Sequence, residues 1–123
     1  MKLAELASPA EVVELERQLD AMFRTLGLDV GFTNHFVERL LGRERPVTVE
    51  EITSAFQRLK DKYKNRLLSA KKRGDYEAIL RDFSNELNIV FGIRGNQLVN
   101  ITIKRKDPNQ FVSNVKGGDE LRV

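Results

Sequence analysis

The sequence predicts an α+β domain in which N-terminal helices pack on one face of a small antiparallel sheet. Three observations support this prediction. Apolar residues recur at spacings of three and four through most of residues 9–70, as in helices, but alternate with polar residues through most of residues 76–106, as in strands. The length of 123 residues, with 41% hydrophobic and 32% charged residues, fits one globular domain.

The predicted domain has three parts. Residues 1–27 are expected to hold an N-terminal helix, residues 28–106 the core of the fold, and residues 107–123 an extended tail, because proline and glycine interrupt any regular pattern there. No apolar run approaches the roughly 20 residues that a bilayer-spanning helix needs. We therefore expect a soluble protein without a membrane partner.

The first helix is predicted over residues 9–26. Ser8 before Pro9 is typical of a helix start, and Gly27 supplies a left-handed C-terminal cap. One stripe of this helix is apolar and is expected to pack on the sheet. The stripe consists of Val12, Leu15, Leu19, Met22 and Leu26. The same spacing would also suit a helix dimer, so the oligomeric state stays open.

A short strand is predicted over residues 28–33, where apolar residues alternate with polar or small ones. Thr33 or Asn34 is then expected to cap a helix that continues to about Leu41, because both side chains accept hydrogen bonds from helix N-termini. Gly42 is expected to end this helix.

A further helix is predicted to begin at Thr48. Thr48 and Glu51 form the pattern of a capping box, in which each side chain accepts a hydrogen bond from the other residue's backbone N–H. Apolar residues at helical spacing continue to about Ala70, and residues 71–75 are expected to form the loop that follows.

Three antiparallel strands are predicted from residue 76 onward, because alternating apolar residues fall in three runs separated by polar turns. The Gly95-Asn96 pair favours a tight hairpin, since both residues tolerate positive φ. The sheet face away from the helices is expected to be open. In the last strand, strict alternation would place a polar set on one side, consisting of Asn100, Thr102, Lys104 and Lys106, and an apolar set on the other, consisting of Val99, Ile101 and Ile103.

The charge of the chain is unevenly distributed. Residues 1–26 hold three basic and five acidic residues, a net charge of −2, whereas residues 60–74 hold seven basic residues and one acid, a net charge of +6. The basic stretch is where an acidic partner such as RNA would bind. The predicted contacts are Lys60, Lys64, Lys71, Lys72 and Arg73. The alternative is a solvated helix face, which is common for lysine-rich helices.

Several classes of site are excluded by composition. The chain has no cysteine, which excludes disulfides and thiolate zinc sites and fits a reducing cytoplasm. A single histidine without clustered acidic residues offers no set of metal ligands, so we expect neither a metal nor a cofactor. Neither the Gly-x-Ser-x-Gly motif of hydrolases nor a phosphate-binding loop is present.

The only histidine, His35, stands near the start of a predicted helix and four residues before Arg39. The positive end of the helix dipole favours a neutral imidazole, which is able to accept a proton from a ribose 2′-hydroxyl. Arg39, with Arg43 or Lys104 as a further cation, would then stabilise the charge that develops on the phosphate. The alternative is that His35 is a surface or capping residue and that Arg39 pairs with a neighbouring glutamate.

The segment Phe32-Thr33-Asn34-His35-Phe36-Val37-Glu38-Arg39, followed by Arg43, Arg45 and the helix start Val47-Thr48-Val49-Glu50-Glu51-Ile52, resembles a recurrent motif. It is similar to a signature of small proteins in the RelE-like, barnase and colicin D related ribonuclease superfamily. The run Ile101-Thr102-Ile103-Lys104-Arg105-Lys106 also resembles the last sheet strand of that group. The stretch from His35 to Lys106 is further similar to small proteins encoded by tailed bacteriophages.

This resemblance implies an α+β fold and, in active members, RNA cleavage without a metal. It maps His35 and Arg39 onto the histidine and arginine of the motif, and Thr102 and Lys104 onto the sheet face that holds RNA. Together with the pattern of charges, this makes His35, Arg39 and Lys104 the predicted catalytic residues, and it adds Arg43, Arg45, Thr102 and Lys106 to the predicted nucleic-acid contacts. The expected function is thus a ribonuclease or toxin-like effector in the cytoplasm, of the host cell if the protein is phage-encoded. The alternatives are a non-catalytic module that binds nucleic acid or host proteins, and a virion or assembly component.

Overall fold

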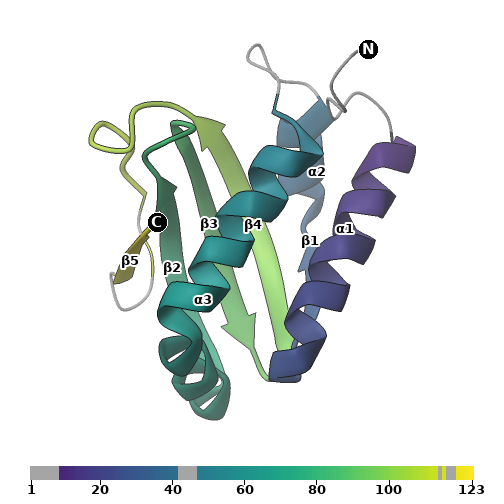
Figure 1. Cartoon of the computed structure of the whole chain (residues 1–123), viewed down its shortest axis with the longest axis vertical. Helices are drawn as coiled ribbons and strands as arrows, with labels where there is room; N and C mark the ends of the chain where they lie inside the picture. Colours follow the sequence, from purple (N-terminus) through teal and green to yellow (C-terminus); the bar gives the residue numbers. More distant parts are fainter. Residues whose placement is uncertain (1–8, 42–46, 114, 116–118) are drawn as a thin grey trace.

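The computed structural model describes residues 9–41, 47–113, 115 and 119–123. Three helices cover one face of a five-stranded sheet, which confirms the α+β prediction (Figure 1). The elements are α1 (Pro9–Phe23), a short 3₁₀ turn η1 (Arg24–Leu26), β1 (Asp29–Phe32), α2 (Asn34–Leu41), α3 (Val49–Arg73), β2 (Asp75–Asp82), β3 (Leu87–Arg94), β4 (Gln97–Arg105) and β5 (Asp119–Arg122). Within these ranges, no helix has the length and apolar character needed to cross a membrane.

The sheet has the strand order β1-β4-β3-β2-β5. Its centre is the predicted antiparallel meander of β2, β3 and β4. Both outer strands pair in parallel, β1 with β4 and β5 with β2, so the sheet is mixed rather than wholly antiparallel. The predicted extended tail is wrong in its last residues, because Asp119–Arg122 pair with Ala78–Arg81 as an edge strand.

Helix α1 packs in the core of this chain as predicted. Leu15 and Leu19 are fully buried, and the predicted Met22 is only partly buried because Phe23 points into the core instead. The Phe23 ring meets Phe56 of α3 edge-on, with 5.8 Å between centroids. Gly27 adopts the left-handed conformation at φ 72° that was expected of a C-terminal cap.

Helix α3 begins with the predicted capping box. The Glu51 N–H donates to the Thr48 hydroxyl at 3.1 Å, and the Thr48 N–H donates to the Glu51 carboxylate at 2.9 Å. The helix continues three residues beyond the predicted end, so residues 71–73 are helical rather than a loop, and Gly74 ends it at φ 81°. Tyr63 interrupts the regular helix at φ −121° and ψ 25°, and this produces a kink.

A β-bulge in β4 changes which residues share a face. Asn100 pairs with Phe91 and Thr102 pairs with Val90, so Ile101 has no partner of its own in β3. The alternation therefore reverses across the bulge. Asn100 and Ile103 are both buried under the helices, whereas Thr102 and Lys104 lie on the other face. The prediction that Asn100 shares a side with Lys104, and Ile103 with Val99, is wrong for this reason.

The sheet face away from the helices is partly covered by the segment that leads to β5. The buried Arg81 guanidinium donates to the backbone carbonyls of Pro108 at 2.6 Å and Phe111 at 2.8 Å. Ile79 and Val90 are buried on this face too, although they do not belong to the hydrophobic core on the helix side. The predicted open face is therefore open only in part.

Candidate nucleic-acid interface

The C-terminal half of α3 carries cations in two rows on opposite sides of the helix. Residues four and seven apart lie on one side of a helix, and each row follows this spacing. The row next to β5 consists of Lys62, Arg66 and Arg73, and the row next to α1 consists of Lys60, Lys64 and Lys71. The two rows place cations on both sides of this half of the helix, with the exposed Asp61, Asn65, Ser69 and Lys72 between them.

The row next to β5 is held by contacts with that strand and with two tyrosines. Lys62 Nζ donates to the Arg122 carbonyl at 2.9 Å, and its ammonium lies 5.4 Å from the centroid of the Tyr63 ring. Arg66 lies over the same ring at 5.6 Å and faces Asp119 at 3.9 Å. These contacts fix the direction of two cations while leaving both residues exposed.

Tyr76 completes this side of the interface. Its hydroxyl donates to Asp119 Oδ2 at 2.7 Å, and the Arg73 guanidinium lies 5.3 Å from its ring centroid. Burial raises the pKa of Tyr76, and the hydrogen bond to Asp119 raises it further. The Tyr76 hydroxyl therefore remains protonated and donates to the Asp119 carboxylate, which lies near Arg66.

The row next to α1 is less constrained. The half-buried Lys60 and the exposed Lys64 make no hydrogen bond or ion pair with any residue in the described ranges. Lys71 has a structural contact, because its Nζ donates to the Leu26 carbonyl at 3.3 Å at the end of η1. Lys60 and Lys64 are thus the cations of this row that are open to a phosphate.

A surface hollow of about 460 Å³ lies at the kink, lined by residues 61–66. Asp61 is the acidic residue of this stretch, and its carboxylate accepts a hydrogen bond from Gln57 at 3.0 Å. The hollow therefore presents ammonium and guanidinium groups together with the half-buried Tyr63. Basic groups interleaved with aromatic rings are typical of surfaces that bind nucleic acid.

The residues predicted to be catalytic lie on two elements, α2 and β4. His35 and Arg39 are exposed on α2, whose Phe36 and Leu40 pack in the helix-side core. Lys104 is exposed on the opposite face of the sheet, because its neighbour Ile103 points into the core. In the described part of the chain, the His35 ring makes no hydrogen bond that would orient it. His35 and Arg39 thus share one helix, whereas Lys104 lies on the sheet face away from the helices.

The remaining predicted contacts are dispersed. Thr102 lies on the same sheet face as Lys104, and Lys106 is exposed just after β4. Arg43 and Arg45 lie outside the described residues. Among the described residues, no cluster of histidine and acidic side chains is suited to hold a metal ion.

Thr33 joins α2 to the sheet. Its hydroxyl accepts from the Phe36 N–H at 3.1 Å as the expected helix cap and donates to the Ile101 carbonyl at 3.0 Å in β4. Its N–H donates to the Asn100 carbonyl at 3.0 Å. These bonds fix the start of α2 beside the bulge and account for the threonine in the motif without a catalytic role.

Three contributors to the interface were missing from the predicted site. Lys62 and Arg66 belong to the basic stretch, and Tyr63 lies between them. The signal for them was available in the sequence, since a tyrosine flanked by cations one and three residues away places the charges beside an aromatic ring. No protein-family model, curated protein or solved structure matches this chain, so its function is inferred from the geometry of the interface.

Proposed function

We propose that this protein binds nucleic acid through the C-terminal half of α3, by contacts with the phosphate backbone. The observation that carries the proposal is the arrangement of basic residues over 60–73, with Asp61 as the one acid in that stretch. Lys64, Arg66 and Lys72 are exposed there. Contacts of this kind supply affinity and orientation without reading the base sequence.

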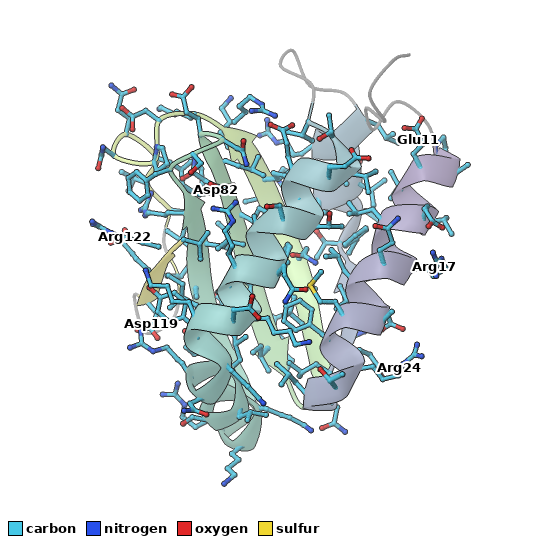
Figure 2. All side chains as sticks on the ribbon, viewed as in Figure 1. Glu11, Arg17, Arg24, Asp82, Asp119 and Arg122 are labelled. Atoms are coloured by element: carbon cyan, nitrogen blue, oxygen red, sulfur yellow. The ribbon has the colours of Figure 1, made fainter. Side chains whose placement is uncertain are left out.

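The distribution of charge in the rest of the molecule supports the same surface. The exposed basic residues of α1 and η1 are paired locally, Arg17 with Glu14 at 2.6 Å and Arg24 with Asp20 at 3.0 Å; Figure 2 labels the two arginines. A polyanion approaching α1 would therefore meet carboxylates, whereas one approaching α3 meets unpaired lysines. We assign Lys60 and Lys64 to direct phosphate contacts on this basis.

Metal-independent RNA cleavage is a second candidate. Its support is the exposure of His35 and Arg39 on one face of α2, four residues apart. In this proposal the His35 ring accepts the proton of a ribose 2′-hydroxyl and Arg39 binds the neighbouring phosphate. The position of Lys104 behind the sheet favours binding without cleavage as the first proposal.

The test measures the affinity of short RNA and DNA strands by fluorescence anisotropy, between about 50 and 200 mM salt. We expect affinity to fall steeply with salt because bound phosphates release counterions. The double variant Lys60→Ala/Lys64→Ala should weaken binding and reduce the slope of log affinity against log salt by about two, one for each lost contact.

The matched control is Arg17→Ala/Arg24→Ala, which removes the same charge from α1 and η1 and should leave the affinity unchanged. Equal losses for the two double variants, or an affinity independent of salt, would contradict the assignment to α3. The bound RNA is also analysed by gel. Cleavage that disappears in His35→Ala would support the second candidate, and intact RNA with the unmodified protein would exclude it for that RNA.

A further inference from the structure

A second hollow, of about 210 Å³, lies beside β5 on the side of the sheet away from the helices. Half of its lining is apolar or aromatic, namely Phe83, Pro108, Phe111 and Val112, and the other half is polar or charged, namely Arg81, Asn109, Glu120 and Arg122. Phe83 is 37% exposed and Val112 is 84% exposed, which is unusual for large apolar side chains. The hollow therefore presents an aromatic ring to solvent next to a cation.

A buried side chain builds the wall of this hollow. Arg81 pairs with Glu120 of β5 and donates to the Pro108 and Phe111 carbonyls, and its side chain is 7% exposed. Its guanidinium also lies 5.9 Å from the Phe111 ring centroid. With its hydrogen bonds directed at these groups, Arg81 positions the wall and does not compete for a ligand.

Arg122 connects the hollow to α3. Its guanidinium lies 5.6 Å from the Phe83 ring centroid, while its carbonyl accepts hydrogen bonds from Lys62 at 2.9 Å and from the Tyr63 hydroxyl at 3.2 Å. In Figure 2, Arg122 projects outward beside β5, on the opposite side of the molecule from α1. Arg122 thus contacts both the start of the basic half of α3 and the ring of Phe83.

We infer that the hollow binds an unpaired base of a single-stranded nucleic acid whose phosphates lie on α3. This inference rests on the proposed function and specifies its ligand. An aromatic ring beside a basic groove is the arrangement on which successive bases stack, and stacking tolerates any base sequence. The bases of a duplex are already stacked on one another and are not available to the Phe83 ring. The Arg122 guanidinium lies over one face of the Phe83 ring, so the base stacks on the other face.

The inference is tested with Phe83→Leu, which keeps an apolar side chain and removes the π-face, and with Phe83→Tyr, which restores the face. Affinities are measured for a single-stranded oligonucleotide and for its duplex. We expect Phe83→Leu to lose about tenfold in affinity for the single strand, a value within the range for one stacked base, and to leave the duplex unaffected. Phe83→Tyr should bind the single strand like the unmodified protein.

A fluorescent base analogue in the strand provides a second readout, because its emission changes when it leaves the neighbouring bases and stacks on Phe83. Thermal unfolding of each variant confirms that the partly exposed position tolerates the change. Unchanged single-strand affinity for Phe83→Leu, combined with weaker binding by Lys60→Ala/Lys64→Ala, would overturn the stacking site and preserve the proposed function. Failure of the unmodified protein to bind either strand would overturn both. If the hollow binds a peptide instead of a base, Phe83→Leu would leave the single-strand affinity unchanged, and the stacking site would be overturned.

Discussion

The two edges of the sheet are closed by helix side chains of opposite charge. At the β1 edge, the Val30 N–H donates to Asp20 Oδ1 of α1 at 3.0 Å. This bond, with the one from Arg24, lowers the pKa of Asp20. At the β5 edge, the Arg122 N–H donates to the Tyr63 hydroxyl at 3.2 Å, and the Arg122 carbonyl accepts from Lys62. One edge is therefore capped by an acid and the other by a cation and a phenol.

Both edges meet the same requirement, a partner for their outward backbone groups, but they meet it with different side chains. Unpaired edge strands favour association with other chains, so both edges need partners for their outward backbone groups. Because the partners are charged, closing the edges also divides the molecule electrostatically. The β1 edge is closed by a carboxylate of α1, whereas the β5 edge lies beside the cations Lys62 and Arg66 of α3.

The largest expected effect concerns the attachment of α1, on which the acidic edge depends. Leu19→Glu places a charge where the side chain is fully buried, and we expect a loss of more than about 4 kcal/mol of stability. Circular dichroism during thermal unfolding should show no cooperative transition. The control Val13→Glu changes a residue of the same helix that is 67% exposed, and it should unfold normally. A folded Leu19→Glu protein would refute the core role of the α1 stripe.

The next effect concerns Asp82, at the end of β2 on the basic side. It is fully buried and accepts hydrogen bonds from Arg58 at 2.7 Å and Asn85 at 2.9 Å. Asp82→Ala removes the buried member of a pair whose arginine is one-third exposed, and it is expected to cost about 3 kcal/mol in urea unfolding at neutral pH, the upper end of the range for hydrogen bonds to a charged group. Asp61→Ala, at an exposed site of α3, is the control and should cost little.

Acid should reduce the effect of the Asp82 change. Burial alone would raise the pKa of Asp82, but the hydrogen bonds from Arg58 and Asn85 outweigh it and lower the pKa. A lowered folded-state pKa gives stability that is present above the unfolded-state pKa of about 4 and is lost as the pH falls through the folded value. The difference between the unmodified protein and Asp82→Ala should therefore shrink in acid. A constant difference would show that the carboxylate charge is not the cause.

The smallest effects test the edges directly. Asp20→Ala removes a charged acceptor from the Val30 N–H, and we expect a cost of about 1.5–3 kcal/mol. Tyr63→Phe removes a neutral hydroxyl from Arg122 and is expected to cost about 1 kcal/mol. Urea unfolding at neutral pH measures both. A larger cost for Tyr63→Phe than for Asp20→Ala would reverse the comparison between the edges.

Local signals made most of the helices predictable. The capping box at Thr48 and the left-handed glycine at position 27 depend on contacts within a few residues, so the sequence alone identifies them. Strand β5 was not predictable in this way. It has four residues, and its partner Ala78–Arg81 lies about forty positions earlier, so only the folded chain brings them together.

The candidate site was predictable in charge but not in arrangement. The basic stretch of α3 is evident in the sequence, but the engagement of Lys71 with the Leu26 carbonyl depends on where η1 ends in space. Likewise, the bulge at Ile101 inverts the faces of the last strand, so counting alternate residues misplaced Asn100 and Ile103. The single extra residue at the bulge, Ile101, therefore places Asn100 on the opposite face of the sheet from Thr102 and Lys104.

The kink at Tyr63 divides α3 into segments that are anchored to different extents. Five of its buried residues precede the kink, namely Val49, Ile52, Ala55, Phe56 and Leu59, whereas Leu67 and Ala70 follow it. Fewer buried contacts mean a lower free energy of local opening. Backbone amides after the kink should therefore exchange with deuterium sooner than those before it. The part of α3 after Tyr63, which carries Lys64, Lys71 and Lys72, therefore changes its position at a lower energetic cost than the part before it.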